Sequence, residues 1–355
     1  MYQRIPTVFI LACIIALVLT PVCIKLGLKL NVVDIPGDNR RMHKRVIPRL
    51  GGLALYVATM AALIVFAGNF SYTPTIVLGG TLTFILGAID DKVQLHAGIK
   101  FAVQIGIASL MYAMGIRMQV MRVFFGSSPI QLSEAADFIF TVLWIVGITN
   151  SINLIDGIDG LASGTVLINT VCMAYIILQD SMSIARIVAI IGLAAMAGAC
   201  LGFLPYNFSP AKTFMGDSGA LFLGFMIGTL STLGRLKGST IITLAIPLLV
   251  IGFPLFDTLF AIVRRAVKKQ HIMTADKQHL HHVLMASGYG HRRAAIMLYG
   301  ISGIMGIAAI LISKGYWLEP TGLFGVVILY IYVFLTDTTA IQDKEKKEKD
   351  KKKEE

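Results

Sequence analysis

The chain has 355 residues, of which 56% are apolar and 14% are charged, and its mean hydropathy is +0.76. A soluble globular protein carries about 25% charged residues, so this composition excludes that class and indicates a polytopic membrane protein. The four cysteines lie in apolar stretches at unrelated spacings. This placement favours small core residues over a disulfide framework or a zinc site.

Long apolar runs follow one another along the chain and predict an all-α fold of about eleven transmembrane helices. The first run has the length of a membrane span and lacks a small-residue cleavage site, so we interpret it as a retained helix rather than a signal peptide. Two prolines, Pro247 and Pro254, predict a kink in the ninth helix. The predicted helices are 5–24, 50–67, 74–90, 98–115, 137–153, 162–178, 184–204, 216–234, 240–264, 294–313 and 320–337.

The connections between these helices are too short for a soluble domain, so we expect one integral domain over residues 1–340. Residues 341–355 are nearly all charged and predict a disordered cytoplasmic tail. The segment 116–131 alternates apolar and polar residues around a Gly-Ser-Ser-Pro turn and predicts a small extracellular hairpin.

The distribution of lysine and arginine predicts the orientation in the membrane. With the N-terminus outside and the C-terminus cytoplasmic, 17 basic residues fall in inner segments and 7 in outer ones, even when the tail is left out. The acidic motifs described below and a histidine-rich loop then all lie on the cytoplasmic side. We therefore expect one cytoplasmic active site in a multi-pass protein of the cell (inner or plasma) membrane.

Asp90 and Asp91 end the third predicted helix. Adjacent carboxylates repel one another unless a cation or a shared proton offsets them. They could bind a metal ion and accept a proton from a phosphate or hydroxyl nucleophile. The alternative, interfacial charges at a helix end, is weakened because negative charge at a helix C-terminus opposes the helix dipole.

The next motif runs from Asn150 to Ala162 and holds Asn153, Asp156 and Asp159. The two aspartates are three residues apart, so a helical turn would place them on one face. A pair of turns or part of a calcium loop are alternatives, although no Glu lies at the spacing of a full calcium loop. The position at a membrane boundary favours a site for a polar ligand.

Asp217 opens the eighth predicted helix in the sequence Phe214-Met215-Gly216-Asp217-Ser218-Gly219. Asp217-Ser218 would serve as an N-cap. The free N–H groups of that helix start could also hold a phosphate, and Asp217 could hold a metal ion that bridges to it. Phe214 could stack on a base, or it could be an ordinary interfacial aromatic.

Two basic cytoplasmic segments carry the remaining candidates: the first basic motif, from His43 to Gly52, and a large inner loop that contains His279-Leu280-His281-His282. The positive-inside bias alone would explain the charge of these segments but not their histidines. Because Arg and Lys lie near the histidines, hydrogen bonding to a diphosphate is favoured over zinc binding. Asp257 in the ninth helix has no assigned role. The candidate substrate-binding residues of these segments are His43, Lys44, Arg45, Arg49, Arg265, His279, His281 and His282.

These five motifs, in this order over residues 1–335, resemble the polyprenyl-phosphate N-acetylhexosamine-1-phosphate transferases of glycosyltransferase family 4. The first basic motif and the His-x-His-His form are similar to the WecA/TagO-like branch, which uses UDP-N-acetylglucosamine (UDP-GlcNAc). They are less similar to the branch that transfers phospho-N-acetylmuramoyl-pentapeptide. Gln94 departs from the family pattern, in which many relatives carry Asp or Lys.

The resemblance implies Mg²⁺-dependent transfer of N-acetylhexosamine 1-phosphate from a UDP-sugar to undecaprenyl phosphate, with Mn²⁺ as a substitute metal. It implies metal ligation by Asp217 and Asp91, and catalytic roles for Asp90, Asp91, Asp156 and Asp159. Asn153, Phe214 and the basic and histidine residues named above would bind substrate. It also implies a homodimer and does not imply a nucleic-acid partner. The product would feed a surface glycan such as teichoic acid or the O-antigen of lipopolysaccharide.

A different class of protein, an ion-coupled secondary transporter, also places acidic residues and broken helices in the membrane. Transporters place these groups near the membrane midplane and often have repeated halves. Here the acidic residues gather at one boundary, and the sequence has no evident internal repeat. A lipid-binding scaffold is a third alternative.

Overall fold

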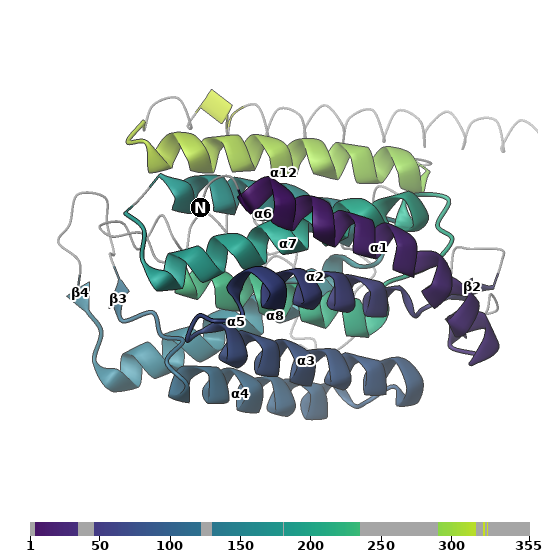
Figure 1. Cartoon of the computed structure of the whole chain (residues 1–355), viewed down its shortest axis with the longest axis horizontal. Coiled ribbons are helices and arrows are strands. Elements are labelled where there is room, and N and C mark those ends of the chain that lie inside the picture. The colour runs from purple at the N-terminus through teal and green to yellow at the C-terminus, as the bar shows by residue number, and fades with distance from the viewer. Residues whose placement is uncertain are drawn as a thin grey trace, which may run out of the picture.

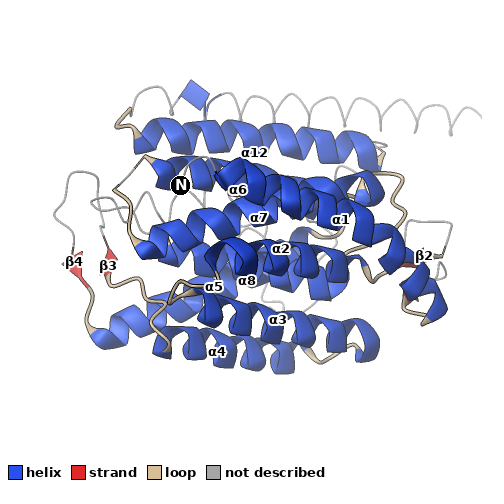
Figure 2. Ribbon diagram, in the orientation of Figure 1, coloured by secondary structure: helices blue, strands red, loops and turns tan. Residues whose placement is uncertain are grey.

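A computed structural model describes residues 4–34, 46–121, 130–179, 181–234, 290–316, 322–323 and 325. These residues form a bundle of long helices that lie roughly side by side, with short strands at its two ends (Figures 1 and 2). Long apolar runs with few interruptions form these helices because a helix satisfies its own backbone hydrogen bonds in an apolar surrounding.

The described helices match the predicted ones to within a few residues. The two remaining predictions, the kinked helix 240–264 and most of 320–337, lie outside the described residues. The largest difference is at the end of the first helix, which continues past Pro21 to Lys29. The helices are α1 (Arg4–Lys29), α2 (Gly51–Ala67), α3 (Thr73–Val93), α4 (Ala97–Ala113), α5 (Glu134–Ile155), α6 (Leu161–Leu178), α7 (Ile184–Asn207), α8 (Gly216–Leu233) and α12 (His291–Ser313).

Six of these helices, α1, α3, α5, α6, α7 and α12, are long and apolar enough to cross a membrane, and α2 and α4 are shorter apolar helices. Together with the composition, they make the chain a multi-pass membrane protein. The four cysteines are free, with Cys23 and Cys200 buried in the core and Cys13 and Cys172 half-buried.

Two small antiparallel ribbons lie at opposite ends of the bundle (Figure 2). β3 (Val120–Met121) pairs with β4 (Ile130–Gln131), which confirms the predicted hairpin. The other ribbon was not predicted: β1 (Val33–Asp34) pairs with β2 (Ile47–Pro48). β2 leads directly into the Arg49–Gly52 part of the first basic motif.

The core of the bundle is built around α8. All of its residues from Ser218 to Leu233 are buried, as expected of a helix that is surrounded by other helices. α8 packs mainly on α3 and α5, and less on α2 and α7. Its first residues therefore lie between the ends of α3 and α5, which both carry acidic motifs.

Gly87 permits a close approach between the end of α3 and the start of α8. A Cβ atom at Gly87 would lie 2.5 Å from the carbonyl oxygen of Asp217 and 2.5 Å from the Cα atom of Ser218. Any side chain there would push the end of α3 away from the start of α8. The absence of a side chain at Gly87 therefore allows Asp90 and Asp91 to lie beside Asp217.

Candidate functional site

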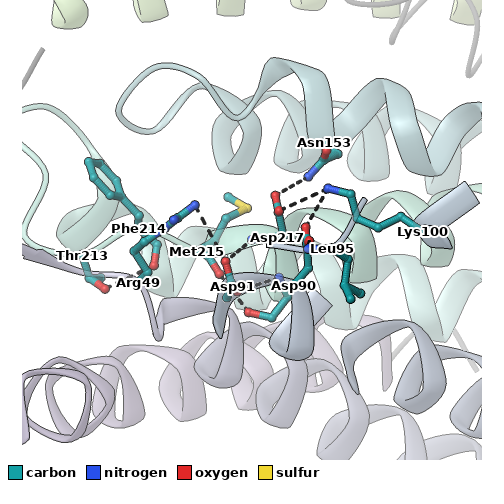
Figure 3. A network of polar contacts seen from close by, with 11 residues as sticks. Arg49, Asp90, Asp91, Leu95, Lys100, Asn153, Thr213, Phe214, Met215 and Asp217 are labelled. Atoms are coloured by element: carbon teal, nitrogen blue, oxygen red, sulfur yellow. Dashed lines mark hydrogen bonds and ion pairs between the residues drawn. The ribbon is translucent and has the colours of Figure 1, made fainter. Parts of the chain in front are cut away.

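Four chain segments that are far apart in the sequence meet at one end of the bundle (Figure 3). Main-chain hydrogen bonds join the first basic motif to the start of α8: Gly51 N donates to Phe214 O and Gly52 N donates to Met215 O, both at 3.0 Å. Phe214 N in turn donates to Pro48 O at 2.9 Å. These bonds hold Arg49 and Asp217 on the same small framework.

Asp91 caps α8 from another helix. Its Oδ1 accepts the N–H of Asp217 at 2.8 Å and its Oδ2 accepts the N–H of Ser218 at 3.0 Å. The side chain is only 5% exposed, and a guanidinium nitrogen of Arg49 lies 3.8 Å from Oδ1. Two charge-assisted bonds to the positive end of a helix make this a strong structural contact.

Two expectations about the start of α8 are therefore wrong. The N-cap position is Met215, which makes no side-chain capping bond, so Asp217-Ser218 is not the cap. The N–H groups of Asp217 and Ser218 are not free for a phosphate, because the Asp91 carboxylate already occupies them. Gly216 makes this arrangement possible: its φ is +68°, and a Cβ atom there would lie 2.5 Å from Asp91 Oδ2.

Asp90 points to the other side of the α3 end and pairs with Lys100 of α4. Lys100 Nζ lies 2.6 Å from Asp90 Oδ2, and the N–H of Leu95 donates to Asp90 Oδ1 at 2.7 Å. Asp90 is 3% exposed. The adjacent carboxylates thus have separate partners, Lys100 for Asp90 and the start of α8 for Asp91.

Lys100 also faces Asp217. Its ammonium nitrogen lies 3.6 Å from Asp217 Oδ2, while Asn153 Nδ2 donates to Asp217 Oδ1 at 2.7 Å. The Asp217 side chain is 28% exposed and is the most open of the three carboxylates. Figure 3 shows Lys100 and Asn153 on one side of Asp217, and Arg49 and Phe214 on the other.

Sequence reasoning missed Lys100, because a single lysine near the start of a helix is indistinguishable from the ordinary positive-inside bias. A signal was nevertheless present. The loop between α3 and α4 spans only residues 94–96, so the first turn of α4 must lie beside the last turn of α3, which carries Asp90.

Asp156 and Asp159 do not share the face of one helix, contrary to the expectation from their spacing. Asp156 follows the end of α5, and the chain turns before α6 begins. Asp159 Oδ2 accepts the N–H of Ala211 at 3.1 Å, and its Oδ1 lies 3.7 Å from His291 Nδ1. The two carboxylates therefore contact different surroundings, because the turn rotates one relative to the other.

Of the site carboxylates described above, Asp156 has the fewest hydrogen bonds. Among the described residues its side chain accepts no hydrogen bond. Burial, followed by the negative charge of Asp217, raises the pKa of Asp156 well above its usual range, and Arg49 opposes this only in part. Asn150, in the same motif, binds Gln104 of α4 at 2.6 Å and takes no part in the network of Asp217.

Several predicted site residues lie outside the described residues, and their roles stay predictions. The predicted residues that the structure brings together are Arg49, Asp90, Asp91, Asn153, Phe214 and Asp217, with Asp156 within electrostatic range. Those outside the described residues are His43, Lys44, Arg45, Arg265, His279, His281 and His282, together with the unassigned Asp257.

Comparison with known proteins identifies the family. Residues 73–235, which include most of this network, match the model of glycosyl transferase family 4. The chain is 40% identical over 333 residues to a probable undecaprenyl-phosphate N-acetylglucosaminyl 1-phosphate transferase of Bacillus subtilis (strain 168), with 93% of this chain and 90% of the relative covered. The chain belongs to glycosyl transferase family 4.

Two further relatives are similar over most of their length. The transferase is 36% identical to the decaprenyl-phosphate N-acetylglucosaminephosphotransferase of Mycolicibacterium smegmatis, over 80% of this chain and 76% of the relative. It is 30% identical to the undecaprenyl-phosphate alpha-N-acetylglucosaminyl 1-phosphate transferase of Thermotoga maritima, over 76% and 78%. The resemblance seen in the sequence motifs is thereby confirmed, and the chain is a sugar-phosphate transferase.

The oxygen atoms of the site suit a magnesium ion whose coordination shell is completed by substrate phosphates. Among the described residues, no group of three or more His, Cys, Asp or Glu side chains is arranged to hold a metal. Mg²⁺ does not require such a set, since it is usually bound by one or two carboxylates, waters and substrate phosphates. Asp217, with a partly exposed carboxylate, fits this role, whereas both oxygens of Asp91 already accept backbone N–H groups.

Proposed function

We propose that this transferase moves N-acetylglucosamine 1-phosphate from UDP-GlcNAc to undecaprenyl phosphate, giving undecaprenyl-diphospho-GlcNAc and UMP. The observation that carries the proposal is the network in which Lys100 joins Asp90 to Asp217 beside Arg49. Cations next to an open carboxylate suit a reaction between two phosphate-bearing substrates. The names of the relatives, which specify N-acetylglucosamine phosphate transfer to polyprenyl phosphates, support the same reaction.

The chemistry is a displacement at phosphorus. An oxygen of undecaprenyl phosphate attacks the sugar-bearing phosphorus of UDP-GlcNAc, the bond from that phosphorus to the bridging oxygen breaks, and UMP leaves with that oxygen. We propose a single displacement without a covalent aspartyl intermediate. Positioning and charge neutralisation can supply most of the rate enhancement in such a reaction.

The described residues have distinct roles in this proposal. Lys100 and Arg49 neutralise the phosphates, and Asn153 orients Asp217. Asp90 is the better of the adjacent aspartates for accepting a proton, because its partner Lys100 can turn toward an incoming phosphate while Asp91 is held by the start of α8. Mg²⁺ bound at Asp217 would stabilise charge on the diphosphate.

We further propose that the chain has eleven spans with its N-terminus outside, a kinked ninth helix and a cytoplasmic tail after one domain of residues 1–340. The site would then lie at the cytoplasmic face of the cell membrane, with the β3–β4 hairpin outside. The excess of lysine and arginine in the inner segments supports this orientation. The product would enter teichoic acid or O-antigen synthesis, and the enzyme would work as a homodimer.

The test is an assay of purified protein in nanodiscs with radiolabelled UDP-sugars, undecaprenyl phosphate and Mg²⁺, in which lipid product and UMP are both measured. We expect UDP-GlcNAc to be used in preference to UDP-N-acetylgalactosamine and UDP-N-acetylmuramoyl-pentapeptide. EDTA and Asp217→Ala should each abolish product formation. Preference for the pentapeptide donor would assign the chain to the other branch, and solute flux without UMP release would support a transporter.

A further inference from the structure

The start of α12 contacts the turn that carries Asp156 and Asp159. His291, the first residue of α12, places Nδ1 at 3.7 Å from Asp159 Oδ1. Two turns later, the hydroxyl of Tyr299 donates a hydrogen bond of 2.5 Å to the carbonyl oxygen of Gly160. Asp159 and Gly160 are thus both contacted by α12, which lies more than 130 residues later in the chain.

Tyr299 is itself fixed in place. Its ring lies against Gly164, where a Cβ atom would come 2.1 Å from the ring carbon Cζ. The ring of Phe208 lies on another side, with 6.4 Å between the ring centroids. A side chain confined by α6 and by the end of α7 delivers its hydroxyl to Gly160 with little freedom to rotate.

Asp159 links this turn to the loop that leads to Asp217. One Asp159 oxygen faces His291 and the other accepts the N–H of Ala211, in the loop between α7 and α8. That loop is braced by Asn207, whose amide donates to Thr213 O at 3.0 Å. A displacement of Asp159 would therefore move both the Asp156 turn and the approach to Asp217.

His291 has a further property that favours a role at this contact. Its Nδ1 atom is buried and makes no hydrogen bond with any of the described residues. A buried nitrogen without a partner is unfavourable unless a nearby charge compensates. The Asp159 carboxylate, which is 14% exposed, supplies that charge. The contact is long for a hydrogen bond but within the range of an ion pair.

We propose that His291 and Tyr299 are positioning residues for the transfer reaction, which act through Asp159 and the Gly160 carbonyl to set the Asp156–Gly160 turn. This inference rests on the proposed function, because the turn matters to catalysis only if Asp156 and Asp159 lie beside the nucleotide-sugar. Neither His291 nor Tyr299 is expected to touch the reacting atoms.

The first test separates positioning from folding with matched variants at His291. His291→Ala removes the ring nitrogen, whereas His291→Asn keeps an N–H donor near the place of Nδ1. We expect kcat/KM for UDP-GlcNAc to fall about tenfold in His291→Ala and to recover to within about threefold of wild type in His291→Asn. KM for undecaprenyl phosphate should stay unchanged in both. Gly300→Ala is the control, because Gly300 lies on the same helix and none of the described residues comes within 4 Å of an added Cβ.

The second test asks whether His291 acts through Asp159. In a double-mutant cycle, His291→Ala should cost less than twofold in kcat/KM when Asp159 is already Asn, because the contact has been lost. Tyr299→Phe should lower kcat/KM for UDP-GlcNAc about fivefold by removing one of the donors to Gly160 O. Tyr175→Phe, toward the other end of α6, is its control and should have no effect.

Equal losses in His291→Ala and His291→Asn, or an additive double-mutant cycle, would overturn the inference and leave His291 with a structural role. So would a loss that falls equally on both substrates. Wild-type activity in the same assay tests the proposed function separately. A failure of the inference and a failure of the proposed function would therefore be distinguished.

Discussion

The Asp90–Asp91 pair at the end of α3 and the Asp156–Asp159 turn between α5 and α6 flank the same site but are held differently. Both oxygens of Asp90 and of Asp91 have partners within the protein. The Asp156 carboxylate accepts no hydrogen bond from the described residues. The first region is assembled before any ligand arrives, whereas the second keeps a carboxyl group that a cation or a ligand group could contact.

The largest effect is expected at Asp91. Asp91→Asn places an amide N–H against a backbone N–H of α8, so it should destabilise the protein by about 2 kcal/mol and lower kcat about 1000-fold. Thermal unfolding and product formation per folded molecule measure the two losses. Asp137→Asn is the matched control, because Asp137 is 5% exposed and accepts the N–H of Gln119 far from the site, at the β3 end.

Asp137→Asn should lower the melting temperature but leave the activity of the folded protein unchanged. If Asp91→Asn loses stability but keeps its activity, Asp91 has only a structural role, like Asp137 at the hairpin end of the bundle.

The next largest effect is expected at Lys100. Lys100→Met removes the cation between Asp90 and Asp217 and should lower kcat/KM about 100-fold. Since Asp90 is nearly inaccessible to water, the loss of its partner should also lower the melting temperature. Lys92→Met, an exposed lysine at the end of the same helix pair, is the control. Equal effects of the two variants would show that only the general positive charge matters.

Asp156→Asn should separate activity from stability. It removes a carboxylate that burial disfavours, so the melting temperature at neutral pH should rise. It also removes a predicted catalytic group, so kcat/KM should fall about 50-fold. The pKa of Asp156 is raised in the folded state, so its contribution to stability is present below the unfolded pKa and is lost as pH rises through the folded pKa. The gain in the variant should therefore shrink toward acid pH.

Melting curves of wild type and Asp156→Asn at several pH values check this prediction. A melting temperature that falls in the variant at neutral pH would mean that Asp156 is satisfied by the protein after all, and that the two acidic regions are alike.

The smallest effect is expected at Asn153. Asn153→Ala removes one hydrogen bond to Asp217, whose other contact with Lys100 remains, so kcat should fall about tenfold. KM for Mg²⁺ should rise at the same time, because Asp217 is less well oriented. Asn150→Ala is the control, since its amide binds Gln104 and Val146 instead. A larger effect at Asn150 would contradict the assignment of Asn153.

The sequence predicted the helices well because each is a long apolar run, and their bounds follow from where polar residues begin. It also correctly predicted that Asp90, Asp91, Asn153 and Asp217 lie in one site. All four were predicted at helix ends on the same side of the membrane, and few helix packings would keep them apart. It could not predict which oxygen faces which donor. Asp91 as the cap of α8 depends on the close approach at Gly87, which only tertiary packing shows.

Spacing misled the interpretation of Asp156 and Asp159, because a three-residue separation places side chains on one face only if a helix continues through both. The positive φ of Gly160 marks a turn there instead. Similarly, the contacts of His291 and Tyr299 join segments more than 130 residues apart and leave no local pattern in the sequence.

The bond between Asp91 and the start of α8 has a consequence for how the site could be observed. The amide hydrogens of Asp217 and Ser218 are donated to a carboxylate of another helix, so they can exchange with solvent deuterium only when α3 and α8 separate. Their exchange rates therefore measure the integrity of the interface between these two helices. A substrate that binds only the open side chain of Asp217 would leave the two amides protected.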